Sequence, residues 1–276
     1  MVEREATPAA KPRSRRFFYI RVAVLLTILA GVLLWAWRDA RSRRARNAWD
    51  HTLTVAVVVV PLESVDEAAI AALRARLPAL EDRLAAELAR HRPGAPRPFR
   101  FELVGPAGAA SPPPLPTADG LVDLVEHSLS LARYLKDIDS RAGLEPDLYD
   151  SRIYVAMRRP RKADRTLVEG RSEQGGRVGV VELELDAEAE AVDLALIVVA
   201  HELLHTLGAL DKYDSSGRTR VPLGLAEPER VPLFPQPYAE IMARNRMVSA
   251  SEERVPGGLA EIAVGPSTAR EIGWLR

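Results

Sequence analysis

One segment in the C-terminal half of the chain has residue types and a spacing suited to metal chemistry. It reads His201-Glu202-Leu203-Leu204-His205. Residues four apart lie on the same face of a helix, so both imidazoles can reach one metal ion. Zinc favours nitrogen ligands, and a catalytic zinc keeps one position of its tetrahedral set open. Glu202 would lie beside that position and could hold a water molecule there without binding the metal.

The residues after this segment offer a third ligand. Gly208 is a natural helix stop, because glycine adopts positive φ at no steric cost and lets the chain turn back sharply. That return would bring the carboxylate of Asp211 to the metal and complete a three-ligand site. Two alternatives stay open at this point. Asp214 is a competing carboxylate, and Asp211 is also of a type common in solvated turns.

The combined motif resembles the extended zinc motif of the metzincin metallopeptidases, in the pattern His201-Glu202-x-x-His205-x-x-Gly208-x-x-Asp211. Most metzincins have His at the last position, and a minority, such as the snapalysin-like enzymes, have Asp. Downstream, Met242 and its neighbours resemble the methionine-containing turn that lies beneath the metal in that family. The resemblance covers residues 200–243 only.

This resemblance implies a zinc-dependent endopeptidase that acts on a protein or peptide substrate. It implies one catalytic Zn²⁺ held by His201, His205 and Asp211, with Glu202 as the general base and Met242 in a structural role. It further implies a metzincin-like twisted mixed sheet, a buried zinc-binding helix and an irregular C-terminal subdomain. An extended substrate would pair with an exposed sheet edge, for which the candidate is Arg165–Val168.

The chain also departs from the family pattern. Arg244 stands where some metzincins have a tyrosine that approaches the metal, so the stabiliser of the transition state is unassigned. Tyr213 and Tyr238 are candidates, although ordinary packing explains each more simply. Two other interpretations are kept: a catalytically inactive metzincin-like binding module, and an anchored structural domain whose histidines have this spacing by chance.

The pattern of apolar residues predicts an α/β (α+β) fold. The helix that carries the two histidines, 187–207, is apolar nearly all round from Leu194 to Ala200 and is therefore expected to be central and buried. A Gly175-Gly176 pair indicates a hairpin turn, and Thr268 with Glu271 indicates a capping box at a final helix. Pro78 is expected to kink or divide a helix over 64–90. The other expected elements are strands at 53–62, 99–104, 153–157, 165–168 and 178–185, and a helix at 119–141.

The N-terminal region has the pattern of a single membrane anchor. Residues 17–37 are apolar except for Arg21, whose side chain can reach the headgroups, and they span about 30 Å as a helix with aromatic residues at both ends. They separate a basic tail (1–16) from a basic juxtamembrane linker (38–50), whose Arg41–Arg46 cluster is expected to face lipid headgroups. Equal numbers of basic residues lie before and after the apolar segment, so they do not determine its orientation in the membrane. The length of the following domain, 51–276, favours a position outside the cytoplasm, which suggests a bacterial inner membrane.

Composition excludes several classes of function. The chain has 38 Lys and Arg against 38 Asp and Glu, but residues 1–50 hold a basic excess, so the remainder is net acidic. A net-acidic body argues against sequence-independent nucleic-acid binding, which needs a basic face. The chain has no Cys, which excludes disulfides, thiolate zinc ligands, thiol nucleophiles and a cysteine latency switch.

Overall fold

The computed structural model describes residues 15–63, 65–114, 120–160, 170–172 and 174–275. The chain forms two units, Met1–Arg44 and Ala45–Arg276. The first unit consists, over its described residues, of most of helix α1 (Arg15–Arg46). This helix is long and apolar enough to cross a membrane, and its most apolar stretch is not buried by other parts of the protein.

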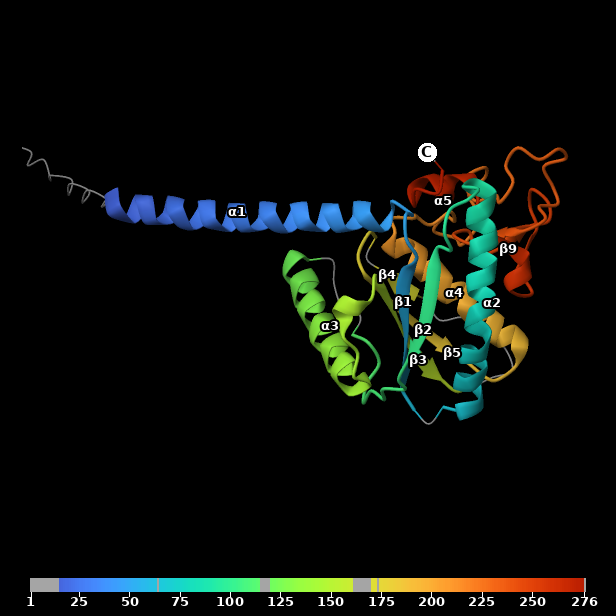
Figure 1. Ribbon diagram of the computed structural model, residues 1–276, viewed down its shortest axis with the longest axis horizontal. Helices are drawn as coiled ribbons and strands as arrows, with labels where there is room; N and C mark the ends of the chain where they lie inside the picture. The colour runs from blue at the N-terminus through green and yellow to red at the C-terminus, as the bar shows by residue number, and fades with distance from the viewer. Residues whose placement is uncertain (1–14, 64, 115–119, 161–169, 173, 276) are drawn as a thin grey trace, which may run out of the picture. The chain divides into compact units, whose positions relative to one another are not determined.

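The second unit is built on a five-stranded mixed sheet with the strand order β2-β1-β3-β5-β4 (Figure 1). Four strands run parallel, and the edge strand β4 runs antiparallel to β5. The strands are β1 (Leu53–Pro61), β2 (Phe99–Val104), β3 (Ser151–Arg158), β4 (Gly170–Ser172) and β5 (Val178–Glu184). The predicted mixed α/β fold is therefore confirmed.

Helices cover both faces of this sheet, because the side chains of a strand alternate between its two faces. On β1, Val55, Val57 and Val59 join the larger apolar core with helices α2 (Glu67–His91) and α4 (Ala189–Thr206). Residues of β1 between them pack with helix α3 (Leu121–Ala142) on the opposite face. Figure 1 shows this layering, with α3 on one side of the sheet and α2 and α4 on the other.

The part of the chain after α4 is mostly irregular, as expected for a small C-terminal subdomain. It contains two two-stranded sheets, one parallel (β6 with β9) and one antiparallel (β7 with β8). The short elements of the second unit are η1 (Pro146–Leu148), β6 (Ala239–Glu240), β7 (Arg246–Met247), β8 (Glu253–Arg254), η2 (Leu259–Glu261), β9 (Ile262–Ala263) and α5 (Pro266–Glu271).

Two local expectations about helices need correction. Of the two outcomes expected at Pro78, division of the helix is wrong, because α2 continues through the proline with a face of buried leucines that packs against the core on both sides of it. The capping box at the final helix is absent, because α5 begins one residue after Gly265 with Pro266 at its first position. Thr268 is instead buried within that helix. The expected strand Arg165–Val168 lies outside the described residues.

The end of α1 belongs to the second unit. Arg46 is 4% exposed and donates hydrogen bonds to the carbonyl oxygens of Gly175 (3.0 Å), Gly176 (2.7 Å) and Thr206 (3.1 Å). Thr206 is the last residue of α4, so the guanidinium satisfies a carbonyl that the helix leaves free. Arg46 therefore binds the folded unit, contrary to the expectation that it faces lipid headgroups.

Candidate metal centre

Helix α4 carries the two histidines through the centre of the second unit. Its residues Leu196, Val199 and Leu203 are fully buried in the larger apolar core, which fixes the rotation of the helix. The helix ends at Thr206, and Gly208 follows with φ of 106°. This left-handed conformation is the one that Gly208 was expected to adopt, and it returns the chain toward the histidines.

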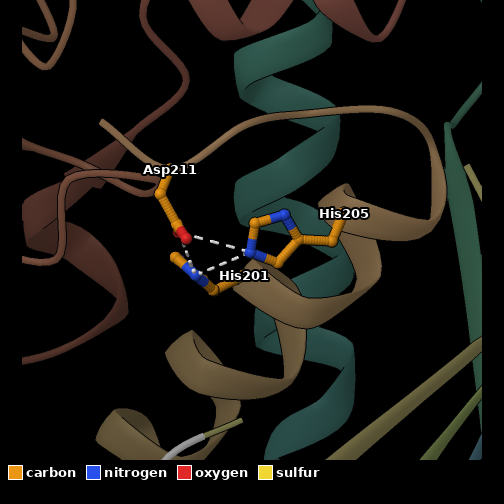
Figure 2. A group of neighbouring side chains, drawn as sticks. All are labelled: His201, His205 and Asp211. Atoms are coloured by element: carbon orange, nitrogen blue, oxygen red, sulfur yellow. Dashed lines mark hydrogen bonds and ion pairs between the residues drawn. The ribbon is translucent and has the colours of Figure 1, made fainter. Parts of the chain in front are cut away.

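His201, His205 and Asp211 converge on one point (Figure 2). The two Nε2 atoms are 3.2 Å apart, and Asp211 Oδ1 lies 3.2 Å from His201 Nε2 and 3.3 Å from His205 Nε2. Tetrahedral zinc with bonds of about 2.0–2.2 Å needs neighbouring ligand atoms roughly 3.3–3.5 Å apart. The observed triangle is within about 0.3 Å of that requirement without rearrangement.

Backbone carbonyl groups orient both imidazoles. His201 Nδ1 lies 2.9 Å from the oxygen of Ile241, and His205 Nδ1 lies 2.8 Å from the oxygen of Ala209. A carbonyl oxygen only accepts hydrogen bonds, so each Nδ1 donates one, and the tautomer that this fixes has its lone pair at Nε2. Asp211 Oδ1 is buried and faces both Nε2 atoms. Three electron-rich atoms thus face one another, an arrangement that a cation stabilises.

The electrostatics of the cluster couple it to pH. Burial raises the pKa of Asp211, but hydrogen bonds and attraction from the two imidazoles outweigh it and hold this pKa well below its usual range. Burial lowers the pKa of His205, whereas Asp211 and the Ala209 carbonyl raise it, and the net shift is upward. Without a metal, His205 therefore holds a proton more readily than free histidine does. A cation held by these three side chains would have to displace that proton, so its affinity would fall in acid.

The structure separates the two carboxylates that the sequence left open. Asp211 lies with the imidazoles, whereas Asp214 is exposed in a turn. There Asp214 Oδ1 accepts hydrogen bonds from the backbone N–H groups of Ser216 (2.9 Å) and Arg218 (3.1 Å). The hydroxyl of Ser216 is the largest cause that lowers the pKa of Asp214, and the two backbone hydrogen bonds lower it further. Asp214 is therefore a turn residue.

A buried ion pair holds the segment that carries Asp211. Lys212 is 2% exposed, and its Nζ donates to Glu271 Oε1 and Oε2 at 2.7 Å and to the oxygen of Leu210 at 2.8 Å. Glu271 Oε2 also accepts from the backbone N–H of Leu210 at 3.0 Å. The two residues that flank Asp211 are thus both fixed to α5.

We expect Glu271→Ala to destabilise the protein by about 3–5 kcal/mol, because it leaves the buried ammonium of Lys212 without its counter-charge. Chemical denaturation of the full-length chain in detergent measures this change. The control is Glu252→Ala, which removes an exposed carboxylate 3.7 Å from Arg254 and is expected to change stability little. Equal stabilities of the two variants would contradict this role for Glu271.

The edge of the sheet holds Glu202 beside His201, His205 and Asp211, which are called the metal-ligand cluster below. It is 3% exposed, and its Oε2 accepts a hydrogen bond of 2.5 Å from the hydroxyl of Ser172 on β4. The other oxygen, Oε1, lies so close to Gly170 that a Cβ at that position would be 2.1 Å from it. The edge strand thus needs a glycine where the carboxylate passes.

The turn at Met242 connects the segment that carries the two histidines with the segment that carries Asp211. Met242 is fully buried, and its carbonyl oxygen accepts a hydrogen bond of 2.9 Å from the backbone N–H of Lys212. The neighbouring carbonyl of Ile241 is the one that orients His201. Glu240, which is buried, accepts from the N–H of Met242 at 2.6 Å, and burial raises the pKa of this carboxyl.

The two tyrosines occupy different places. Tyr213 stacks on the ring of His201 with centroids 6.3 Å apart, and burial raises its pKa to about 12, with the nearby Asp211 adding to the shift. Tyr238 instead packs under the guanidinium of Arg83, 5.1 Å from its ring centroid. Only Tyr213 therefore lies at the cluster.

A cleft of about 450 Å³ opens beside His201 and Glu202. Its polar lining residues include Tyr213, Arg244 and Asn245. Its apolar lining residues, referred to below as the apolar wall, are Leu194, Ile197, Val198, Ile241, Val255 and Pro256.

Sequence reasoning missed the residues that support the site. Ser172, Glu240 and Glu271 lie far along the chain from their partners, and none belongs to a local motif. Lys212 carried one usable signal, since a lysine beside a ligand carboxylate in a compact turn needs a counter-charge. The spacing of residues along the chain could not show that the counter-charge is Glu271, on the final helix.

Comparison with protein-family models finds no match to the chain, and no curated protein matches it. Among solved structures, the chain is similar to archaemetzincin from Methanopyrus kandleri, at 18% sequence identity and a TM-score of 0.30. The match covers 60% of this chain and 79% of that one. At this level the similarity establishes neither a family nor an activity. The function is therefore inferred from the geometry of the chain itself.

Proposed function

We propose that this protein is a membrane-anchored, zinc-dependent endopeptidase. The observation that carries the proposal is the triangle of His201 Nε2, His205 Nε2 and Asp211 Oδ1, with sides of 3.2–3.3 Å. Two imidazoles and one carboxylate form a ligand set that zinc favours in catalytic sites. The metzincin-like order of these residues and the turn at Met242 support the same assignment.

The residues around the ligands fit hydrolysis of a peptide bond. Zinc bound there would supply Lewis acidity, which polarises a carbonyl group and makes water acidic enough to deprotonate near neutral pH. Glu202 is the general base, since it lies next to His201 in the cleft and carries no positively charged partner among the described residues. It takes a proton from water during attack and donates it to the leaving amine. Ser172 holds the carboxylate in place.

The cleft and the sheet edge suit an extended peptide. Strand β4 is the edge of the described sheet, and it passes directly over Glu202 through Gly170. A peptide that pairs with this edge by main-chain hydrogen bonds would lie across the cleft. The earlier candidate for that edge, Arg165–Val168, stays a prediction. The apolar wall of the cleft would accept an apolar side chain.

Helix α1 is proposed as the membrane anchor, through residues 17–37. Its length and its apolar composition support this assignment. The catalytic domain would lie outside the cytoplasm, at a bacterial inner membrane, because long C-terminal domains are translocated largely regardless of flanking charge. The domain boundaries at residues 16, 37 and 50 remain predictions, and no nucleic-acid partner is proposed.

Removal of the metal tests the proposed activity. We expect a chelator to abolish cleavage of a peptide library by the purified full-length chain, and stoichiometric zinc to restore it. The chelator removes the Lewis acid, while Glu202 and the cleft remain in place. Cleavage that persists after complete removal of zinc would overturn the proposal. A zinc-loaded chain that cleaves no peptide would favour the inactive binding module.

A further inference from the structure

Arg244 lies in the cleft in an uncommon backbone conformation. Its φ is 72°, and within the described ranges only Trp49 shares a positive φ among residues other than glycine. A left-handed conformation at a residue with a Cβ costs free energy and persists where the surroundings impose it. Here it follows directly after the buried turn at Met242, and it directs the chain so that Arg244 lines the cleft.

An aromatic ring holds the guanidinium toward the metal-ligand cluster. The Cζ atom of Arg244 lies 5.0 Å from the centroid of the Tyr213 ring, and that ring stacks on His201. Cation–π contact of this kind orients an arginine without neutralising its charge. The guanidinium is thus placed one ring away from a proposed zinc ligand, and its N–H groups donate no hydrogen bond to any of the described residues.

The charge of Arg244 is not balanced within the cleft. Among the described residues, no carboxylate forms an ion pair with it, and it is the only Lys or Arg in the cleft lining. The one carboxylate of the lining, Glu202, is bound to Ser172 and is needed as the base. An exposed guanidinium with free donors in a fixed position is a binding site for a carboxylate.

We propose that Arg244 is a specificity-determining residue that binds a carboxylate of the substrate next to the scissile bond. This inference rests on the proposed peptidase function. The carboxylate could be supplied by an Asp or Glu side chain or by a free C-terminus. Both have the planar geometry that a guanidinium binds through two parallel hydrogen bonds. The apolar wall of the cleft would hold a neighbouring uncharged side chain.

The test compares the zinc-loaded full-length chain with its Arg244→Gln variant on one peptide library. Each sequence is made with Glu or with Gln at every position near the centre, and with a free or an amidated C-terminus. We expect wild type to cleave the carboxylate-bearing peptides with a kcat/KM about 10–100-fold higher, and Arg244→Gln to lose this preference. The matched control is Arg254→Gln, which alters an exposed arginine outside the cleft and should keep the preference.

A binding measurement separates this inference from the proposed activity. Immobilised Glu202→Gln chain, with and without Arg244→Gln, is used to capture the same library. Enrichment of acidic or free-C-terminal peptides that depends on Arg244 supports the inference even if wild type cleaves nothing. The two arms of the library identify which carboxylate is bound. Equal capture of Glu and Gln peptides, or a preference that survives Arg244→Gln, would overturn it.

Discussion

Replacing Glu202 with Gln is expected to lower kcat by about 10²–10⁴-fold while bound zinc is retained. Gln has the shape of Glu, so the hydrogen bond with Ser172 can be kept and the ligand triangle is untouched. The amide has no basic oxygen that can take a proton from water, so the step assigned to Glu202 fails. Peptide cleavage rates and zinc content, measured on the same preparations, give the two quantities.

The matched control for this variant is Glu190→Gln. Glu190 lies on the same helix, α4, but is exposed at its N-terminal end and far along the helix from the cluster. The chemical change is identical, so any general effect of losing one carboxylate from α4 appears in both variants. Full activity of Glu202→Gln, with zinc bound, would remove Glu202 from the mechanism.

The His205→Ala variant is expected to lose zinc. Replacing a residue that only orients a metal ligand already costs about 10–100-fold in metal affinity, and loss of one of three ligands should cost more. The variant should fold, because His205 is partly buried and does not belong to the apolar core. Competition with a chromophoric chelator measures the affinity. His51→Ala, at an exposed histidine outside the cluster, is the control.

The pH dependence of zinc affinity provides an independent check on the same residue. The pKa of His205 is raised in the metal-free chain, mainly by Asp211 against the effect of burial. Zinc must displace the proton, so affinity should be highest above that raised pKa and fall as pH drops through it. Affinity that is unchanged between pH 8 and pH 5 would contradict the assignment of His205 as a ligand.

The metal-ligand cluster could be predicted from the sequence because its parts are local. His201 and His205 are one helical turn apart, and Gly208 returns the chain within three residues, so helix geometry alone brings them near Asp211. The choice between Asp211 and Asp214 was not available from spacing. It depends on the ion pair of Lys212 with α5, which fixes the turn from a distant part of the chain.

The supporting parts of the site could not be predicted, because their partners are joined by the fold. Ser172 reaches Glu202 because strand β4 pairs with β5 as the antiparallel edge of the sheet. The position of Arg244 in the cleft likewise depends on its own left-handed backbone conformation, directly after the turn at Met242. A sequence pattern reports the tendency of each segment but not the contacts that override it, as the continuous helix through Pro78 also shows.

X-ray absorption at the zinc edge of the zinc-loaded full-length chain tests the shared ligand site most directly. The expected spectrum has two imidazole nitrogens and carboxylate or water oxygens at about 2.0–2.2 Å, with four ligands in all. The imidazole signal should fall in His201→Ala. A spectrum of six oxygen ligands without imidazole, identical in wild type and in that variant, would show that the three side chains do not bind a common ion.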